Sequence, residues 1–479
     1  MPKKRGCAIL TRDGASSGKE RMIWVKPSFF VKDKDFYKTL VRLSLPAALQ
    51  SLISLLVLMA DNVMVSRFHA EALAPVSQAN SVSTFVTAAL SGLGGGAMVL
   101  ISQYWGKRDT ESVKRVFAVT FSVCLLFAAV IVSVIELFPH AVISVVLDRQ
   151  EAELTPIAIS YLRIACLAYL PLAVTSALTG SLKGVEVVKM TLYAAVISLL
   201  SNVCLNAVLI FGLFGLPALG VQGAAIATVA ARVIELAVVW TYCFRVQKAI
   251  AIHPKELFRH EGWAWRDYAR FGLPVGLTDA QWALVGLLKM AIIGYLGKTM
   301  MSAMNITDTM INLGTMFTFA LAGGACVLVG KAVGAGDYAR ARQYSQTIQV
   351  LFACVGVVMC TIVFCLRKPF ISLYGQEQDV VTLASQMIAI GALTLLGTTY
   401  HASCFVGINR GAGDSRFVMT VDMICGWLVV LPLTWLAAFV WKLPLPLVFL
   451  CTRIDQCFKW IIAMVRLRGN RWIKNVTRP

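Results

Sequence analysis

The sequence has few charged residues for its length, and this shortage excludes most soluble classes of protein. Asp, Glu, Lys and Arg make up 14% of its 479 residues, whereas about 25% is usual in soluble domains. Apolar residues account for 58%, well above the soluble average. A soluble enzyme, a collagen-like chain and a disulfide scaffold are therefore excluded, and a membrane protein remains.

Patterns that hold metals or disulfides are lacking as well. The 13 cysteines include no C-x-x-C pair, and all except Cys7 fall in apolar stretches, where cysteine usually serves as a small packing residue. The five histidines show no spacing typical of metal ligands. We therefore expect no metal site, no disulfide framework and no cofactor.

Long uncharged runs take up most of the chain. Residues 72–106 contain no charged side chain over 35 positions, and residues 190–231 contain none over 42. A helix needs about 20 apolar residues to cross a bilayer. These and similar runs predict an all-α polytopic membrane protein with twelve transmembrane helices, near residues 38–66, 72–104, 110–138, 152–182, 187–212, 219–246, 266–295, 299–332, 337–366, 378–409, 414–440 and 443–466.

Positive charge is distributed unevenly between the two sides of such a chain. The two tails and the loops after even-numbered helices hold 33 of the 44 Lys and Arg, and the odd-numbered loops hold six. An excess of Lys and Arg marks the cytoplasmic side, so we expect both termini in the cytoplasm. The basic residues are not interleaved with aromatic ones, and we expect no nucleic-acid binding.

The chain also repeats itself at a spacing of about 228 residues. Each match keeps the same orientation, because six predicted spans separate its members. This predicts two six-helix lobes, related by a pseudo-twofold axis along the membrane normal, around a central cavity. Three segments match later ones: 42–46 with 270–274, 95–109 with 323–337 and, one residue out of step, 180–184 with 407–411.

The resulting division of the chain has five parts. The lobes are joined by a basic cytoplasmic linker and flanked by two cytoplasmic tails, of which the first is expected to be disordered. The parts are the N-terminal tail 1–36, the N-lobe 37–247, the linker 248–264, the C-lobe 265–470 and the C-terminal tail 471–479.

Several motifs in these lobes resemble the multidrug and toxic compound extrusion (MATE) family of cation-coupled antiporters. In chain order they are Leu45-Pro46, residues 59–65 (MADNVMV), 202–206 (NVCLN), 223–228 (GAAIAT), 329–337 (VGKAVGAGD) and 410–416 (RGAGDSR). The resemblance covers roughly residues 38–465 and rests on the order and spacing of the motifs together. It implies export of organic cations or other amphipathic molecules against inward sodium or proton flow.

Four N-lobe residues are candidates for cation coupling. Asp61 is an intramembrane carboxylate, which is costly and favours its protonated form where water is excluded; a helix-capping role is the alternative. Asn202 and Asn206 are four residues apart and share a helix face, where they can coordinate a cation or bond between helices. Thr228 can add a hydroxyl or satisfy its own backbone.

The family resemblance implies an N-lobe cation site that joins these residues. Asp61, Asn202 and Thr228 match its pattern, whereas Asn206 stands where the family has a second Asp. The site then has one carboxylate, which favours a proton over sodium as the coupling ion.

The C-lobe offers a different set of charges. Lys289 occupies the position equivalent to Asp61 in the second repeat, and Asp279 and Asp308 are its nearest acidic residues in the sequence. Lys289 and Asp308 are candidates for the wall of the substrate cavity; a structural ion pair within the membrane is the alternative.

Four uncharged or weakly basic C-lobe residues are further candidates for the substrate cavity. His401 is a proton relay, a substrate contact or a packing residue, and Tyr400 precedes it. Trp282 and Met290 can line an adaptable apolar cavity or belong to the core. Separately, Arg232 and Glu235 are three residues apart and are expected to pair.

The favoured hypothesis is a secondary active exporter, an antiporter moving organic cations, drugs or related metabolites out of the cell by rocking of the two lobes. We expect a monomer in the bacterial inner membrane, surrounded by lipid, that takes a small cationic amphipathic substrate. A flippase for lipid-linked precursors or polysaccharides is the alternative, and it favours several basic residues facing the cavity. An intramembrane transferase is a remote third, because the sequence lacks a paired acid–base motif.

Overall fold

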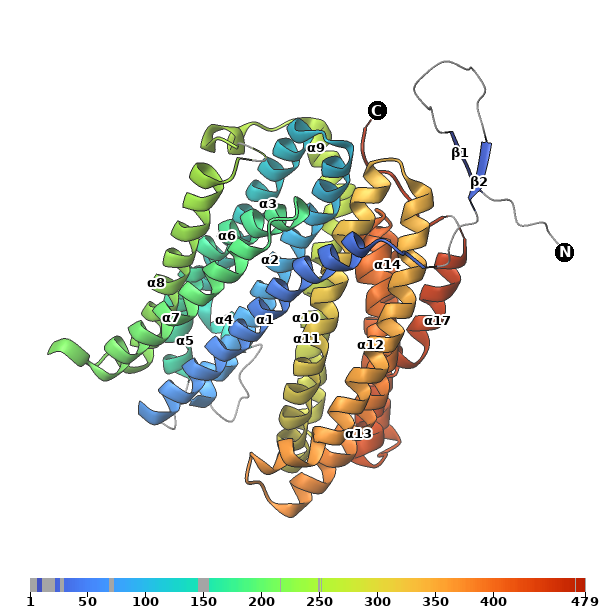
Figure 1. Ribbon diagram of the computed structural model, residues 1–479. Coiled ribbons are helices and arrows are strands. Elements are labelled where there is room, and N and C mark those ends of the chain that lie inside the picture. The colour runs from blue at the N-terminus through green and yellow to red at the C-terminus, as the bar shows by residue number, and fades with distance from the viewer. Residues whose placement is uncertain are drawn as a thin grey trace.

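The computed structural model describes residues 7–10, 22–25, 30–68, 73–144, 155–215, 217–248, 250, 252–469 and 471–478. Apart from one short β-ribbon, the regular structure in these ranges is helical. The helices form two bundles that meet at one end of the molecule and diverge at the other (Figure 1). The predicted all-α polytopic fold with two lobes is confirmed.

The N-lobe is built from long helices with few interruptions. The second half of its fourth span follows a single 3-10 turn, and the last span ends in a π-helical stretch. Its elements are α1 (Lys34–Phe68), α2 (Leu73–Lys107), α3 (Thr110–Leu137), α4 (Pro139–Ser144), α5 (Thr155–Ala165), η3 (Cys166–Ala168), α6 (Tyr169–Gly184), α7 (Lys189–Phe211), η4 (Leu213–Gly215), α8 (Gly220–Thr241) and η5 (Tyr242–Val246).

The C-lobe follows the same order but is more often interrupted by π-helical turns. The linker contributes η6 (Pro254–Phe258) and α9 (Gly262–Asp267). The lobe itself contains η7 (Tyr268–Gly272), α10 (Leu273–Gly294), α11 (Lys298–Gly334), α12 (Tyr338–Ser372), α13 (Gln378–Ala402), η8 (Ser403–Asn409), α14 (Ser415–Met423), η9 (Ile424–Val430), α15 (Leu431–Trp435), η10 (Leu436–Val440), α16 (Leu445–Cys451) and α17 (Asp455–Arg468).

Eleven helices in the described ranges are long and apolar enough to cross a membrane. The twelfth predicted segment, 443–466, is present but is not one helix, because α16 stops at Cys451 and α17 starts at Asp455. Hydropathy alone did not reveal this break. Two of the charges around it take partners on neighbouring helices: the half-buried Arg453 donates to Thr394 of α13, and the buried Lys459 pairs with Asp422 of α14 as well as with Asp455 of its own helix.

The repeat extends to the way helices begin. Asp109 caps α3 by accepting a hydrogen bond from the backbone N–H of Ser112 at 3.0 Å. Asp337, 228 residues later, caps α12 by accepting one from the N–H of Arg340 at 2.9 Å. A carboxylate at this position satisfies a helix donor that has no partner within the helix. The same cap at the same repeat position therefore starts the third helix of each lobe.

The N-terminal region contains more structure than the sequence indicated. Strands β1 (Cys7–Leu10) and β2 (Met22–Val25) pair as an antiparallel ribbon. The packed part of the chain begins at Val31, whose N–H donates to Thr347 Oγ1 at 3.1 Å, and Phe36 is 2% exposed. The other residues of the expected disordered tail, 1–6, 11–21 and 26–29, lie outside the described residues.

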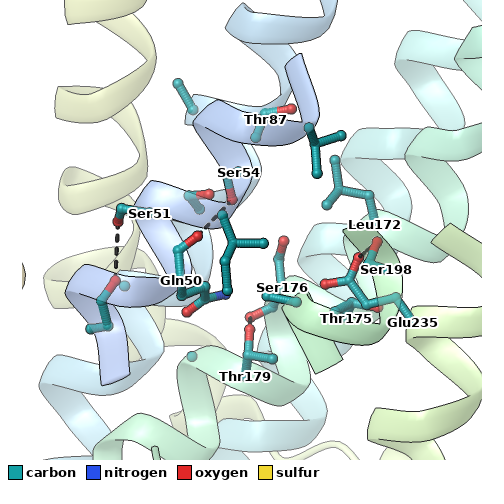
Figure 2. Close-up of a pocket in the computed structure, with 18 of the residues that line it drawn as sticks. Gln50, Ser51, Ser54, Thr87, Leu172, Thr175, Ser176, Thr179, Ser198 and Glu235 are labelled. Carbon is teal, nitrogen blue, oxygen red and sulfur yellow. Dashed lines mark hydrogen bonds between the residues drawn. The ribbon is translucent and has the colours of Figure 1, made fainter. Parts of the chain in front are cut away.

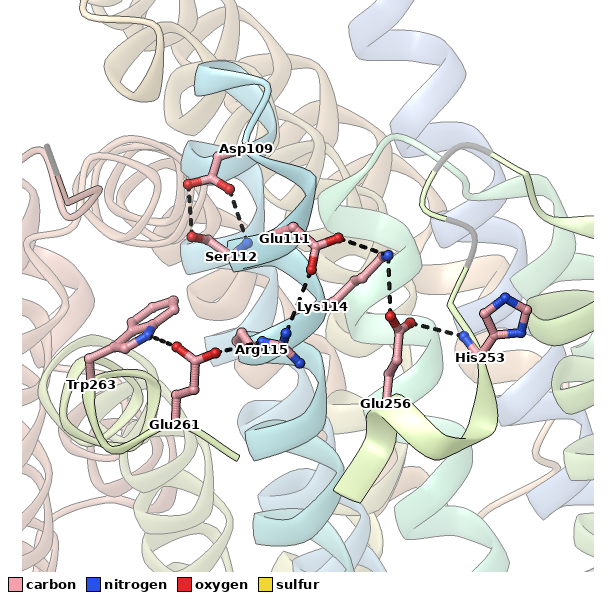
Figure 3. Close-up of polar contacts among 9 residues, drawn as sticks. All are labelled: Asp109, Glu111, Ser112, Lys114, Arg115, His253, Glu256, Glu261 and Trp263. Atoms are coloured by element: carbon pink, nitrogen blue, oxygen red, sulfur yellow. Dashed lines mark hydrogen bonds and ion pairs between the residues drawn. The ribbon is translucent and has the colours of Figure 1, made fainter. Parts of the chain in front are cut away.

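The linker between the lobes is fixed to the start of α3 (Figure 3). Glu256 accepts a hydrogen bond from the N–H of His253 at 3.0 Å and pairs with Lys114 at 3.3 Å. Glu261 pairs with Arg115 at 2.9 Å. Partial burial alone would raise the pKa of Glu256, but the N–H of His253 and the Lys114 ammonium hold it below its ordinary value.

At the end of the molecule where α1 begins, the lobes touch backbone to backbone. Helices α2 and α11 cross there so closely that a Cβ added at Gly334 would lie 1.9 Å from the carbonyl oxygen of Gln103. Glu186, at the end of α6, forms an ion pair with Lys331 of α11 at 2.6 Å. These contacts close this end of the space between the lobes.

The C-terminal segment lies across the same closed end. The N–H of Val476 donates to Gln103 Oε1 of α2 at 2.9 Å, and the N–H of Lys474 donates to the carbonyl of Ala412 at 2.8 Å. Arg478 forms two hydrogen bonds with Asp267 of α9, at 3.0 and 3.2 Å. The segment therefore contacts the N-lobe, the linker and the C-lobe at once.

Candidate functional site

A cavity of about 750 Å³ lies between the lobes. Six N-lobe helices, α1, α2 and α5–α8, form most of its wall, and α10 and α11 of the C-lobe close one side. Figure 2 shows a lining rich in hydroxyl and amide groups. The polar and charged lining residues are Gln50, Ser51, Ser54, Asp61, Asn80, Ser83, Thr84, Thr87, Ser91, Tyr161, Tyr169, Thr175, Ser176, Thr179, Lys183, Ser198, Thr228, Arg232, Glu235 and Asp279.

Three of the four predicted coupling residues come together where α1 packs on α7. The amide nitrogen of Asn206 donates to the Asp61 carboxylate and also to Asn202 Oδ1, the latter at 3.2 Å. Asn202 and Asn206 are 2% and 0% exposed, so the predicted shared helix face is a buried one. The carbonyl oxygen Oδ1 of Asn206 is buried without a hydrogen-bond partner, which leaves an acceptor available beside the carboxylate.

The fourth residue, Thr228, lies on the cavity wall but not in this cluster. Its hydroxyl donates to the carbonyl of Ala224 in its own helix at 3.0 Å. One turn further along α8, Arg232 interacts electrostatically with Asp61. Thr228 therefore shares the cavity with Asp61, while the charge next to that carboxylate comes from Arg232.

Glu235 is a second carboxylate that lines the cavity. The sequence predicts it only as the ion-pair partner of Arg232. The predicted pairing is confirmed, with Arg232 at 2.7 Å. The hydroxyl of Ser198 on α7 also donates to Glu235 at 3.1 Å. Residues 228, 232 and 235 recur at helical spacing and share one face of α8. This spacing was the signal that could have predicted Glu235 as a cavity residue together with Thr228.

Two tyrosines complete the polar wall near Asp61, and no sequence pattern singled them out. The hydroxyl of Tyr161 donates to Asn80 Oδ1 at 3.1 Å, and the hydroxyls of Tyr169 and Ser83 are 2.8 Å apart. All four side chains line the cavity. An aromatic residue within an apolar helix gives no signal of which way it faces, so these contacts needed the structure.

Asp279 is the charged residue that α10 contributes to the cavity, and its partner differs from the one considered from the sequence. It pairs with Arg410 at 2.8 Å, where the two side chains are 34% and 9% exposed. Lys289, for which Asp279 was a candidate partner, interacts electrostatically with Asp308 and Arg453 instead. Arg410 directly follows η8, which packs against α11, and its guanidinium reaches Asp279 of α10.

The six C-lobe residues predicted to face substrate lie elsewhere in the described structure. None of them belongs to the cavity lining, and their contacts are made within the C-lobe. Their role in binding substrate stays a prediction. They are Lys289, Asp308, Tyr400, His401, Trp282 and Met290.

Tyr400 and His401 have partners within the C-lobe. The hydroxyl of Tyr400 donates to Gln349 Oε1 at 2.9 Å. His401 Nδ1 lies 3.1 Å from the carbonyl oxygen of Gly397 one turn earlier, and its ring packs edge-on against Phe405. This arrangement corresponds to the packing alternative considered for His401.

Trp282 lies beneath a buried lysine. The Lys459 ammonium stands 4.5 Å from the ring centre of Trp282 and pairs with Asp422 at 2.7 Å and Asp455 at 3.2 Å. Met290 packs against the core formed by α11 and α13. Asp455 and Lys459 are four residues apart in the last span, and with Asp422 they form a buried ion-pair cluster.

Comparisons with known proteins agree with this architecture. The family model for MatE matches residues 46–208 and again 274–436, once in each lobe and 228 residues apart. An uncharacterized transporter of Bacillus subtilis, YisQ, is 25% identical over 418 residues, covering 87% of this chain and 90% of that protein. A probable multidrug resistance protein of Rhizobium meliloti, NorM, is 27% identical over 392 residues, covering 79% and 82%.

Solved structures share the fold. A crystal structure of MATE in complex with MaL6 superposes with a TM-score of 0.80 at 18% identity, over 90% of this chain and 96% of that one. A transporter of the MOP superfamily from Pyrococcus furiosus, described as having a binding pocket of reversed polarity, also gives 0.80 at 18% identity, over 92% and 97%.

Proposed function

Because the chain belongs to the MatE family of multidrug transporters, we propose that it is an antiporter that exports organic cations and related amphipathic metabolites in exchange for inward proton flow. It is a transporter and not an enzyme. The observation that carries the proposal is the Asp61 cluster, in which a carboxylate that lines the cavity between the lobes is bonded to the buried Asn206, which is bonded in turn to Asn202.

The hydrogen bonds of the cluster favour a proton over sodium. Asn206 directs its amide N–H₂ toward Asp61 and Asn202, and the Thr228 hydroxyl donates to its own helix. Sodium needs several oxygen ligands at once, as hard cations do, whereas here Asp61 and Asn202 each accept a hydrogen bond from Asn206, and Asn206 Oδ1 is the oxygen of the cluster without a partner. A proton needs only the Asp61 carboxylate, whose neutral form the apolar surroundings favour.

The charges of the cavity wall support a cationic substrate. Three carboxylates, Asp61, Glu235 and Asp279, line it against two cations, Lys183 and Arg232. A flippase for anionic lipid-linked precursors would favour the opposite balance. The cavity is accordingly a place where an organic cation and a proton compete for the same carboxylate, which is the requirement for exchange.

We further propose that the transporter acts as a monomer in the bacterial inner membrane with both termini in the cytoplasm. The distribution of Lys and Arg, 33 against six, supports this orientation. Asp33, just before α1, pairs with Arg340, and Asn475 near the C-terminus donates to Tyr338. The residue just before α1 and the C-terminal segment therefore both contact the start of α12, on one side of the molecule.

The test uses the purified full chain in proteoliposomes, with a pH gradient or a sodium gradient imposed separately and a panel of fluorescent organic cations. We expect uptake driven by the pH gradient alone, and its loss in Asp61→Asn. Asp308→Asn is the comparison variant, since Asp308 is an intramembrane carboxylate of the C-lobe outside the cavity lining, and the same measurement tests its predicted role in the substrate cavity.

Each outcome separates one part of the proposal from the rest. Full coupled transport by Asp61→Asn would remove this residue from the coupling mechanism. Transport driven by the sodium gradient alone would show that sodium, and not the proton, is the coupling ion. Loss of transport in Asp308→Asn, with unchanged thermal stability, would move coupling to the C-lobe.

A further inference from the structure

We propose that the cavity contains an anion subsite built around Lys183, so that the preferred substrates are amphiphiles that carry a carboxylate as well as a cationic group. The inference rests on the proposed function and specifies its substrate class. It starts from the position of Lys183 in the last turn of α6, where the side chain lines the cavity between the lobes.

Lys183 is the one charged residue of the described cavity wall whose side chain has no polar partner. Asp61 is bonded to Asn206, and Arg232 to Glu235. Asp279 is paired with Arg410. An ammonium group in a membrane protein is costly to leave unpaired, and this side chain lines the space that substrate would fill.

The internal repeat shows which partner is missing. In the repeat match 180–184 with 407–411, Lys183 corresponds to Arg410. In the match that begins at 42–46 with 270–274, Asp279 corresponds to Ser51. The C-lobe pair of Arg410 and Asp279, 2.8 Å apart, thus becomes Lys183 and Ser51 in the N-lobe.

The N-lobe therefore has the cation of this pair and a serine where the C-lobe has the carboxylate. Ser51 lines the same cavity, and its hydroxyl donates to the carbonyl of Ala47 at 3.1 Å. A serine cannot neutralise an ammonium. A carboxylate brought by the substrate would restore the pair that the C-lobe makes internally, through a charge-assisted hydrogen bond.

Neighbouring side chains supply further donors to such a group. Ser176, Thr179 and Lys183 lie on one face of α6, at i, i+3 and i+7. Gln50 of α1 and Ser176 point into the same cavity (Figure 2), and neither side chain has a hydrogen-bond partner in the described structure. The ammonium, an amide N–H₂ and a hydroxyl are the groups that recognise a carboxylate.

Two dyes that differ only at a carboxylate test this subsite. Rhodamine 110 has a free carboxyl group, and rhodamine 123 is its methyl ester with the same cationic ring system. Binding of each is measured by fluorescence anisotropy to the full chain in phosphatidylcholine nanodiscs, for the unmodified protein, Lys183→Met, Lys183→Arg and Lys189→Met. Lys189 is the matched control, because it is an exposed lysine one loop away and outside the cavity lining.

We expect Lys183→Met to weaken binding of rhodamine 110 by about tenfold or more, the usual effect of losing a hydrogen bond to a charged group, and to leave rhodamine 123 unchanged. Lys183→Arg should keep most of the preference, and Lys189→Met all of it. Equal losses for both dyes, or no change for either, would overturn the subsite.

Two further outcomes separate the subsite from lipid binding and from the proposed function. If phosphatidylglycerol in the nanodisc removes the preference for rhodamine 110, Lys183 serves a lipid headgroup and the substrate assignment is overturned. If the preference persists while proteoliposomes show no exchange with protons, the subsite stands and the coupling proposal fails. An unmodified protein that binds neither dye contradicts both.

Discussion

Replacing Gly334 by alanine tests whether the backbone contact between α2 and α11 keeps the lobes closed at one end. A Cβ at Gly334 would lie 1.9 Å from the carbonyl oxygen of Gln103, whereas ordinary contact begins at 3.4 Å. The helices must separate locally by about 1.5 Å, because backbone atoms cannot rotate out of the way. Overpacking of this kind costs typically ~1–3 kcal/mol, which shifts a two-state equilibrium by about 5- to 150-fold.

Hydrogen–deuterium exchange of the protein in nanodiscs measures this opening directly. We expect faster exchange in Gly334→Ala for peptides covering residues 99–108 and 328–337, where α2 and α11 cross. Gly323→Ala is the control on the same helix, since a Cβ there meets nothing within 4 Å. Unchanged exchange in Gly334→Ala, or an equal effect of Gly323→Ala, would refute the reasoning. A uniform increase that includes α5 and α8 would indicate unfolding and would also contradict it.

Two further predictions concern stability. Lys459→Met leaves two buried carboxylates without their cation, so it should lower the free energy of unfolding by about 3–5 kcal/mol. Arg163→Ala removes a largely exposed pair with Glu136 and should lower it by less than about 1 kcal/mol. Similar losses of stability for the two variants in thermal unfolding would contradict this contrast. The pKa of Glu256 lies below its ordinary value of 4.5, so its stabilising contacts are present at neutral pH and are lost as the pH falls through the lowered value. Glu256→Gln should therefore flatten the decline in melting temperature between about pH 5 and pH 3, and parallel curves for both proteins would argue against the linker contact.

The fold could be predicted because a helix that crosses a bilayer must be long and apolar, and both properties are visible directly in the sequence. Long uncharged runs marked the spans, and matches such as 95–109 with 323–337 marked the two lobes. The break between α16 and α17 could not be read in this way. The break depends on charged side chains whose partners lie on other helices. Hydropathy is averaged over many residues and does not reveal such individual contacts.

The site could be predicted only where its residues share one helix. The spacing of Asn202 and Asn206 placed both on one face, and the structure joins them to Asp61. Which polar residues of different helices face the same cavity depends on how each helix is rotated about its axis. For this reason the sequence predicts Glu235 only as an ion-pair partner and does not single out Lys183.

The π-helical turns of the C-lobe bear on how the two lobes came to differ. Among the described residues the C-lobe has four such stretches, η7 to η10, where the N-lobe has η5. An added residue in an α-helix would turn everything after it by about 100°, whereas a π-turn takes it up locally. Two lobes built from the same repeated unit can therefore differ in length at such turns while the helices that follow keep their packing.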